Sequence, residues 1–182
     1  MKAIQVAKNI YVIENFFSEE ECNRYVIESE REGYSNATVN TDKGQKIIED
    51  VRNNKRIIYK DFELANRLWS KLKNLAPLKI GNSVSQGLNE LFRFYRYEPG
   101  QLFKKHIDES FIRNEREASY FTFMIYLNDD FEGGDTTFDE INIKAKKGMA
   151  LIFLHSLPHE GAEVKSGRKY VLRTDIMYKL AE

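Results

Sequence analysis

Two stretches of the chain repeat apolar positions at the spacing of an amphipathic helix. The first opens with a capping box formed by Ser18 and Glu21, and it runs to Gly33, a residue type that favours helix ends. The second begins after Asp61, whose side chain is suited to cap a helix, and is stopped by Pro77. Its apolar stripe consists of Leu64, Ala65, Leu68, Trp69, Leu72 and Leu75. Stripes of this kind predict helices that pack against a core.

Most of the other apolar positions fall in short runs rich in β-branched and aromatic residues, which is the pattern of β-strands. Turn residues such as Pro99-Gly100 and Gly133-Gly134 separate these runs. The six predicted strands are Ile10–Glu14, Arg56–Tyr59, Glu90–Tyr97, Tyr120–Leu127, Met149–Leu154 and Lys169–Tyr178. Early helices followed by many strands predict a mainly-β fold, with N-terminal helices packed outside a β-sandwich or jelly roll.

Length and charge narrow the class of protein. A chain of 182 residues is expected to form a single domain with a real core. Its 28 basic and 28 acidic residues cancel, whereas nucleic-acid-binding proteins usually carry a basic excess. No nucleic-acid partner is therefore expected.

The remaining features of the composition concern location. The single cysteine, Cys22, excludes an intramolecular disulfide framework. Lys8 and Asn9 interrupt the N-terminal segment before an apolar run long enough for a signal peptide, and no run is long enough to span a membrane. These observations predict a cytoplasmic protein with no membrane partner.

Candidate chemistry centres on the three histidines. His106 and Asp108 form an H-x-D triplet, and in an extended chain both side chains point to the same face. One further imidazole would complete the two-histidine, one-carboxylate triad that binds Fe(II) with open positions. His159 follows an apolar strand and is the candidate for that ligand. His155 lies among apolar residues and is interpreted as a histidine of the core or rim.

Four ordered blocks surround this triplet. They are FFSEEECNRYV at 16–26, FYRYEPGQ at 94–101 leading to HID at 106–108, FMIYLNDDFEGGDT at 123–136, and HEGAEVKSGRKYV at 159–171. In order and spacing they resemble the prolyl 4-hydroxylase branch of the 2-oxoglutarate/Fe(II) dioxygenases, over nearly the whole chain. The resemblance implies a double-stranded β-helix, with residues 1–80 as helical and strand support and 90–180 as the catalytic core of the single domain 1–182.

The resemblance also implies a cofactor set and its ligands. Fe(II) would be held by His106, Asp108 and His159, and O2 and 2-oxoglutarate would be co-substrates, with ascorbate as a reductant. Lys169 matches the cation that pairs with the far carboxylate of 2-oxoglutarate. A dianion that enters a barrel interior needs such a partner, because desolvation would otherwise exclude it. Tyr97 and Tyr126 match tyrosines of the same co-substrate pocket.

Arg173 and Phe103 depart from the collagen-type members of that family. Arg173 shares a strand face with Lys169 and is a further candidate for co-substrate binding; its alternatives are pairing with Asp175 or contact with an acidic substrate. Phe103 stands where collagen-type relatives tend to carry a tyrosine. Collagen-like handling of the substrate is therefore not expected.

The implied reaction is hydroxylation of an unactivated C–H bond with release of succinate and CO2. Arg52, Asn53 and Arg56 lie in a segment that resembles the loop over the substrate groove, and they are the candidate substrate contacts. A peptidyl, prolyl-type substrate is the first interpretation, and a free amino acid or small molecule is the second. An AlkB-like nucleic-acid demethylase and a non-catalytic jelly-roll binding module are the remaining alternatives. The sequence predicts no oligomeric state.

Overall fold

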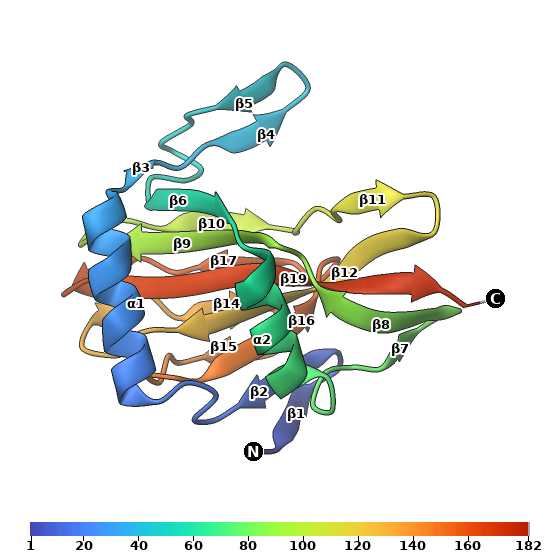
Figure 1. Ribbon diagram of the computed structural model, residues 1–182. Helices are drawn as coiled ribbons and strands as arrows, with labels where there is room; N and C mark the ends of the chain where they lie inside the picture. The colour runs from blue at the N-terminus through green and yellow to red at the C-terminus, as the bar shows by residue number, and fades with distance from the viewer. Residues whose placement is uncertain (182) are drawn as a thin grey trace.

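The computed structural model describes residues 1–181. Most of this part of the chain forms antiparallel β-strands, and most of these strands belong to two sheets (Figure 1). The main sheet has eleven strands, and the path along it is β1-β2-β16-β12-β19-β9-β6-β3. The strands on this path are β1 (Ala3–Ala7), β2 (Ile10–Ile13), β16 (Ala150–Leu154), β12 (Glu117–Tyr126), β19 (Lys169–Leu180), β9 (Leu91–Tyr97), β6 (Lys55–Lys60) and β3 (Ser35–Asn36). Strands β7 (Lys79–Ile80), β8 (Ser83–Leu88) and β11 (Ile112–Asn114) attach beside it.

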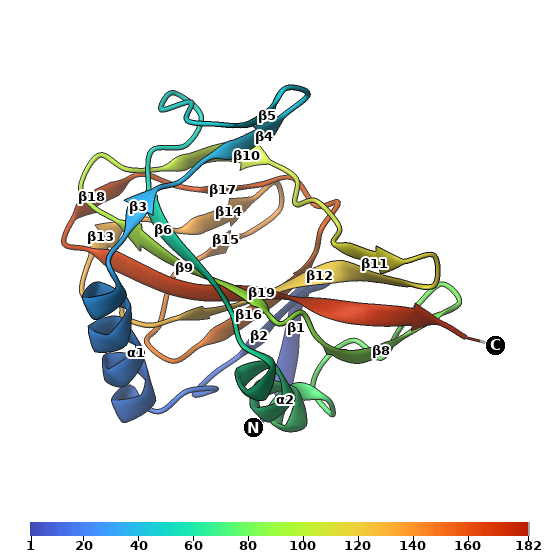
Figure 2. The same cartoon turned by 45° about the horizontal axis from the view of Figure 1, so that its top comes forward.

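The smaller sheet has four strands and lies over one face of the main sheet (Figure 2). Its order is β10 (Phe103–His106), β17 (His159–Gly161), β14 (Thr136–Phe138) and β15 (Asn142–Ile143). Two-stranded pairs complete the fold, β13 (Glu132–Gly133) with β18 (Val164–Ser166) and β4 (Val39–Thr41) with β5 (Gly44–Lys46). Two facing antiparallel sheets with helices outside confirm the predicted jelly-roll class.

The two helices cover the outer face of the main sheet (Figure 1). Helix α1 (Glu19–Glu32) has both halves of the predicted capping box, with Ser18 and Glu21 bonding to each other's backbone N–H. Helix α2 (Phe62–Leu72) begins as predicted, because the Asp61 carboxylate accepts from the Leu64 N–H at 2.8 Å. It ends before the predicted Leu75, which packs against the core from a short turn after the helix.

All six predicted strands are confirmed as β2, β6, β9, β12, β16 and β19, with small differences at their ends. The sequence pattern missed the short strands, above all those of the smaller sheet. Strands of two to four residues, some of them largely exposed, carry too little alternation of apolar and polar positions to be recognised.

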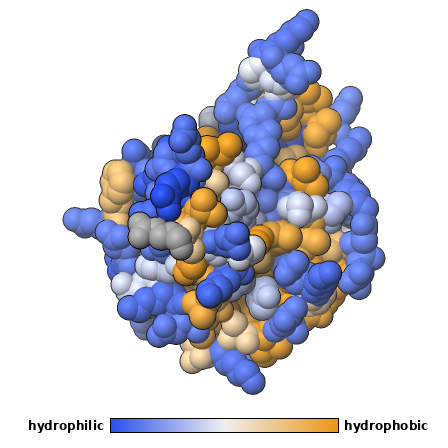
Figure 3. Space-filling model, turned by 90° about the vertical axis from the view of Figure 1, so that its right-hand side faces the viewer, coloured by the Kyte–Doolittle hydropathy of each residue, from blue (hydrophilic) through white to orange (hydrophobic). Residues whose placement is uncertain are grey.

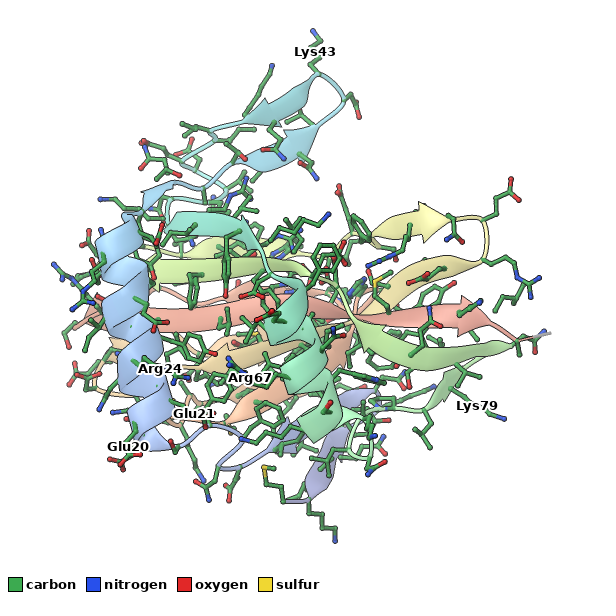
Figure 4. All side chains as sticks on the ribbon, viewed as in Figure 1. Glu20, Glu21, Arg24, Lys43, Arg67 and Lys79 are labelled. Carbon is green, nitrogen blue, oxygen red and sulfur yellow. The ribbon has the colours of Figure 1, made fainter. Side chains whose placement is uncertain are left out.

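The β4–β5 hairpin stands out from the body of the molecule, with Lys43 at its tip (Figures 3 and 4). Its surface is hydrophilic, and the chain that returns from it reaches β10 through a bridge between Arg52 and Phe103. Neither helix within residues 1–181 is long and apolar enough to cross a membrane.

Candidate metal and co-substrate site

Strand register brings together two histidines that are far apart in the sequence. His106 at the end of β10 and His159 at the start of β17 are direct partners across the smaller sheet. Their rings lie 4.4 Å apart between centroids. Neighbouring strands of a sheet lie about 5 Å apart, so directly opposite residues meet on the same face.

Both rings are held in one tautomer by the same local contact. The Nδ1 atom of His106 lies 2.7 Å from the carbonyl oxygen of Lys104, and that of His159 lies 3.0 Å from the carbonyl oxygen of Leu157. A carbonyl only accepts, so each Nδ1 carries a proton, and in a neutral ring the Nε2 lone pair is then the one left for a metal. Burial lowers the pKa of His159 to about 4, which keeps that ring neutral. Fixed, neutral imidazoles of this kind are typical metal ligands.

Asp108 supplies a carboxylate to the same place. Its Oδ2 accepts hydrogen bonds from Thr122 Oγ1 at 2.5 Å and forms a salt bridge with Arg173 Nη2 at 3.0 Å. Its Oδ1 lies 3.6 Å from the Nε2 of His106. Burial alone would raise the pKa of Asp108, but the Arg173 charge and the hydrogen bonds it receives hold that pKa well below its usual value. The group is therefore an anion with one oxygen already engaged.

Together, these three residues present one ligand atom each within 4.8 Å of one another. Two imidazoles and one carboxylate, beside a cavity, form the donor set that suits Fe(II) with open coordination positions. The residues present therefore fit the metal that the sequence resemblance implies.

Lys169 occupies one end of the cavity, and its side chain is only 3% exposed. Its Nζ donates to the carbonyl oxygen of Gly134 at 2.5 Å and lies 5.2 Å from the ring centre of Tyr97. Gly134 has a positive φ of 66°, and a Cβ there would come within 3.3 Å of the lysine side chain, so the turn needs glycine. Burial lowers the pKa of Lys169 to about 8. No carboxylate within residues 1–181 forms a salt bridge with it.

Tyr97 and Tyr126 lie beside Lys169 on neighbouring strands. Tyr97 lines the cavity directly, and burial raises its pKa to about 12. The Tyr126 hydroxyl is fully buried and shares a 2.7 Å hydrogen bond with Thr136 Oγ1. Thr136, rather than Tyr126, lines the cavity. Both tyrosines are therefore uncharged neighbours of the lysine.

Arg173 lies on the same face of β19 as Lys169, as alternation along a strand requires, but its partners differ. It forms salt bridges with Asp108 at 3.0 Å and with Asp175 at 3.3 Å, and its Nη1 donates to the Tyr95 hydroxyl at 3.2 Å. The predicted alternative of pairing with Asp175 is thus present, together with a contact to Asp108 that the sequence did not indicate.

His155 is separate from the ligand cluster. It is 4% exposed, and its Nε2 lies 3.6 Å from Asp175 Oδ1. Its backbone carbonyl accepts from the Asp108 N–H at 3.0 Å, so it supports the carboxylate through the main chain. Phe103 stacks on His106, with ring centres 3.5 Å apart and planes 16° from parallel. The phenylalanine covers one face of that imidazole.

The three predicted substrate contacts lie in and after the loop that returns from the hairpin. Arg52 is buried, with its guanidinium 4.3 Å from the ring centre of Phe103. The Asn53 side chain ties this loop to the next one, because its Oδ1 accepts from the Leu102 N–H at 2.8 Å. Arg56, at the start of β6, donates to Thr38 Oγ1 at 2.5 Å.

Sequence reasoning missed Thr122, Thr136 and Tyr95, which line the same cavity. A usable signal existed for two of them. Thr122 lies two and four residues before Met124 and Tyr126, and Tyr95 lies two residues before Tyr97, so alternation along a strand puts them on one face.

Comparison with known proteins identifies related sequences. The model of the 2OG-Fe(II) oxygenase superfamily matches residues 92–174, which include all three candidate metal ligands and Lys169. Prolyl 4-hydroxylase 1 of Arabidopsis thaliana is 26% identical over 196 residues, covering 93% of this chain and 69% of that protein. A putative prolyl 4-hydroxylase of Acanthamoeba polyphaga mimivirus is 28% identical over 140 residues, covering 62% of this chain and 57% of that protein.

Solved structures share the fold. The viral collagen prolyl hydroxylase of Paramecium Bursaria Chlorella virus-1, in its 2OG complex, has a TM-score of 0.65 and 22% identity, covering 95% of this chain and 97% of its own. The Trichoplax adhaerens prolyl hydroxylase, in complex with a peptide fragment of the hypoxia inducible factor, has a TM-score of 0.69 and 18% identity, covering 92% and 83%. The sequence match, the fold and the donor set agree. Residues 92–174 are thus similar to the 2OG-Fe(II) oxygenase superfamily, and the relatives, the fold and the donor set support an Fe(II)- and 2-oxoglutarate-dependent dioxygenase of the prolyl 4-hydroxylase type.

Proposed function

We propose that the protein hydroxylates a C–H bond of a peptidyl, prolyl-type substrate and releases succinate and CO2. His106, Asp108 and His159 hold Fe(II), which supplies the oxygen-activating redox chemistry when bound. The observation that carries the proposal is the meeting of these three ligand atoms within 4.8 Å, beside a cavity that ends at a buried lysine.

Lys169 binds the far carboxylate of 2-oxoglutarate in this proposal, and Tyr97 and Tyr126 shape its pocket. The far carboxylate needs a cation set apart from the metal by the length of the molecule. Lys169 is the better candidate because it lines the cavity and forms no salt bridge with the candidate ligands among residues 1–181, whereas Arg173 contacts the ligand Asp108 itself. Burial makes the lysine an effective partner, since a charge pair is stronger where water is excluded.

The chain's own groups also control orientation. The carbonyls of Lys104 and Leu157 fix both imidazoles, and Thr122 and Arg173 both bind Oδ2 of Asp108 and so fix the orientation of that carboxylate. Arg52, Asn53 and Arg56 lie in and after the loop that returns from the β4–β5 hairpin, and they are proposed as the substrate contacts. A peptide substrate is supported by the prolyl hydroxylase relatives, one of which has been solved with a peptide.

The decisive experiment is anaerobic addition of Fe(II) and then 2-oxoglutarate to metal-free protein, followed through the visible charge-transfer band of a chelated keto acid. We expect the band in the wild type and in His155→Ala, whose imidazole lies outside the ligand cluster, and its loss in His159→Ala. A folded wild type without the band would overturn the proposal. Succinate formation in air then tests turnover, and mass spectrometry of offered prolyl peptides tests the substrate.

A further inference from the structure

Four arginines surround Tyr95, which lines the cavity together with one of them, Arg173; we call Arg52, Arg56, Arg93 and Arg173 the arginine cluster. Strand register sets three of them on one face, because Arg56 is the direct partner of Tyr95 and Arg93 is the direct partner of Arg173. Arg52 approaches from the loop before β6, with its guanidinium 4.6 Å from the ring centre of Tyr95.

This arrangement is electrostatically unfavourable by itself. Like charges directly opposite each other on adjacent strands repel, and Arg93 and Arg173 occupy such positions. Asp175 lies between them, 3.6 Å from Arg93 Nη1 and 3.3 Å from Arg173 Nη2. Asp108 also pairs with Arg173, but it is a proposed metal ligand, and a bound Fe(II) would share its negative charge.

Arg52 and Arg56 have only neutral partners. The Nε of Arg52 donates to Asn54 Oδ1 at 2.6 Å, and Arg56 donates to Thr38 and to Gln45 Oε1, the latter at 3.3 Å. Within residues 1–181, neither guanidinium forms a salt bridge with a carboxylate.

An unpaired donor in the same place points to a missing ligand. Arg52 is 4% exposed, and its buried Nη2 has no hydrogen-bond partner within residues 1–181. A buried guanidinium without an anion is costly, and planar guanidinium groups bind carboxylates through paired hydrogen bonds. The surroundings agree with an excess of positive charge. Burial and the charges of Arg52, Arg93 and Arg173 lower the pKa of Arg56, while burial, which would raise the pKa of Tyr95, is outweighed by arginine charges that lower it to about 8.

We propose that the arginine cluster binds a carboxylate of the substrate, so that the enzyme selects an acidic group beside the C–H bond that it oxidises. This proposal rests on the proposed function, and it adds Arg93 to the specificity-determining residues. Lys169 already serves 2-oxoglutarate in that function, which leaves the arginines for the substrate. The carboxylate belongs either to an aspartate or glutamate side chain in a peptide or to a free main-chain carboxyl group, as in a short peptide or amino acid.

Three matched probes distinguish these sources. N-acetyl-Pro-Asp-amide carries a side-chain carboxylate, N-acetyl-Pro-Asn with a free C-terminus carries a main-chain carboxylate, and N-acetyl-Pro-Asn-amide is neutral. Binding is measured by anaerobic calorimetry on enzyme loaded with Fe(II) and 2-oxoglutarate. We expect at least one acidic probe to bind about tenfold or more tightly than the neutral probe, as charge-assisted hydrogen bonds to a guanidinium predict. The better acidic probe identifies the source.

Variants assign the effect to the cluster. Arg56→Gln and Arg93→Gln, made separately, should each reduce the preference for the acidic probe severalfold, and Arg56→Lys should retain part of it. Arg96→Gln is the matched control, because Arg96 lies on β9 as Arg93 does but pairs with Glu30 on the helix side of the sheet. It should keep the preference. Thermal melting of each variant confirms that it is folded.

Equal affinity of wild type for acidic and neutral probes, including no binding of any probe, would overturn the inference. So would a preference that survives in both Arg56→Gln and Arg93→Gln. The charge-transfer band, recorded on the same samples, distinguishes failure of this inference from failure of the proposed function. Its presence without an acidic preference contradicts this inference alone, whereas its absence contradicts the proposed function itself.

Discussion

The two cationic ends of the cavity are built in opposite ways. At one end, Lys169 is enclosed and forms no salt bridge with any carboxylate of residues 1–181, and its neighbours are a backbone carbonyl and two aromatic rings. At the other end, the arginine cluster gathers guanidinium groups from three strands and a loop, with Asp175 in its midst. A buried cation without a salt bridge suits one small partner that never varies, whereas a group of several guanidinium groups suits a larger ligand that enters from outside.

The difference also has a cost in stability. Burying an ammonium group without a counter-ion destabilises the fold until its anion binds, while the arginines are partly neutralised by their own acidic neighbours. On the proposed function, 2-oxoglutarate supplies the anion that the lysine end lacks.

The candidate metal ligands belong to the same cavity as both cationic regions, and removing one of them has the largest expected effect on turnover. His106→Ala and Asp108→Ala should reduce succinate formation to background while the protein stays folded, because the remaining two ligands no longer hold the metal on which turnover depends. Succinate assays and circular dichroism check this. Lys105→Ala, on the same strand with an exposed side chain, is the control and should retain turnover. Full activity in His106→Ala would contradict the assignment.

Separating the two ends comes next. Lys169→Ala should raise the KM for 2-oxoglutarate by about 10- to 100-fold, which is the loss expected for a charge-assisted hydrogen bond. Arg173→Ala should instead impair metal affinity and substrate use, because its contacts go to Asp108 and Asp175. Steady-state kinetics with varied 2-oxoglutarate distinguish them. If Lys169→Ala is silent and Arg173→Ala loses 2-oxoglutarate, the carboxylate anchor is Arg173.

Two threonine variants test the same division between metal binding and 2-oxoglutarate binding, with smaller expected losses of affinity. Thr122→Val removes the hydroxyl that donates to Asp108 and should weaken Fe(II) binding by about tenfold, as loss of a ligand's hydrogen-bond partner does. Thr136→Val removes the partner of the Tyr126 hydroxyl and should affect 2-oxoglutarate more than Fe(II). Metal titration of both variants measures this. Equal loss of Fe(II) affinity in the two would contradict the division of the cavity.

The smallest expected effect is a pH dependence at the lysine end. The pKa of Lys169 is lowered to about 8, so its charged fraction falls above that pH. Affinity for 2-oxoglutarate should drop about fivefold between pH 8 and pH 9, from the fraction of protonated lysine. Lys169→Arg should flatten this profile, since arginine stays charged. A drop that persists in Lys169→Arg would assign it to another group.

Stability should change with the opposite sign. The folded pKa of Lys169 lies below its unfolded value of 10.5, so the unfolded state binds more protons between the two pKa values. The burial penalty is complete below pH 8 and is relieved as the pH rises toward 10.5. Lys169→Met should therefore stabilise the metal-free protein near neutral pH by about 1–3 kcal/mol, measured by denaturant unfolding. Destabilisation of this variant would mean that the ammonium is better compensated than its contacts indicate.

Local signals carried the parts of the fold that the sequence predicted well. The capping box of Ser18 and Glu21 and the cap at Asp61 are decided within one turn of helix, and long strands such as β12 and β19 repeat their pattern many times. The predicted end of α2 lies too far along the chain, because the apolar spacing continues to Leu75 although the helix ends at Leu72. Packing in a following turn can preserve the same stripe.

Contacts between residues on different strands could not be predicted from such local signals. Thr122 meets Asp108, and Arg93 meets Arg173, only because particular strands lie side by side in particular registers. A single sequence contains no local signal for such pairings. The family resemblance named the ligands and Lys169, yet the burial of Arg52 under the rings of Tyr95 and Phe103 needed the folded chain.

The direct pairing of His106 with His159 has a consequence for how such sites drift in evolution. Hydrogen-bonded register joins the two histidines, so the count of residues between them is free to change. Insertions in the exposed turn at 139–140 would lengthen the interval and leave the pair intact. One residue added inside β10 or β17 would turn a histidine to the opposite face. Searches for distant members should therefore keep each short block rigid and let the gaps between blocks vary.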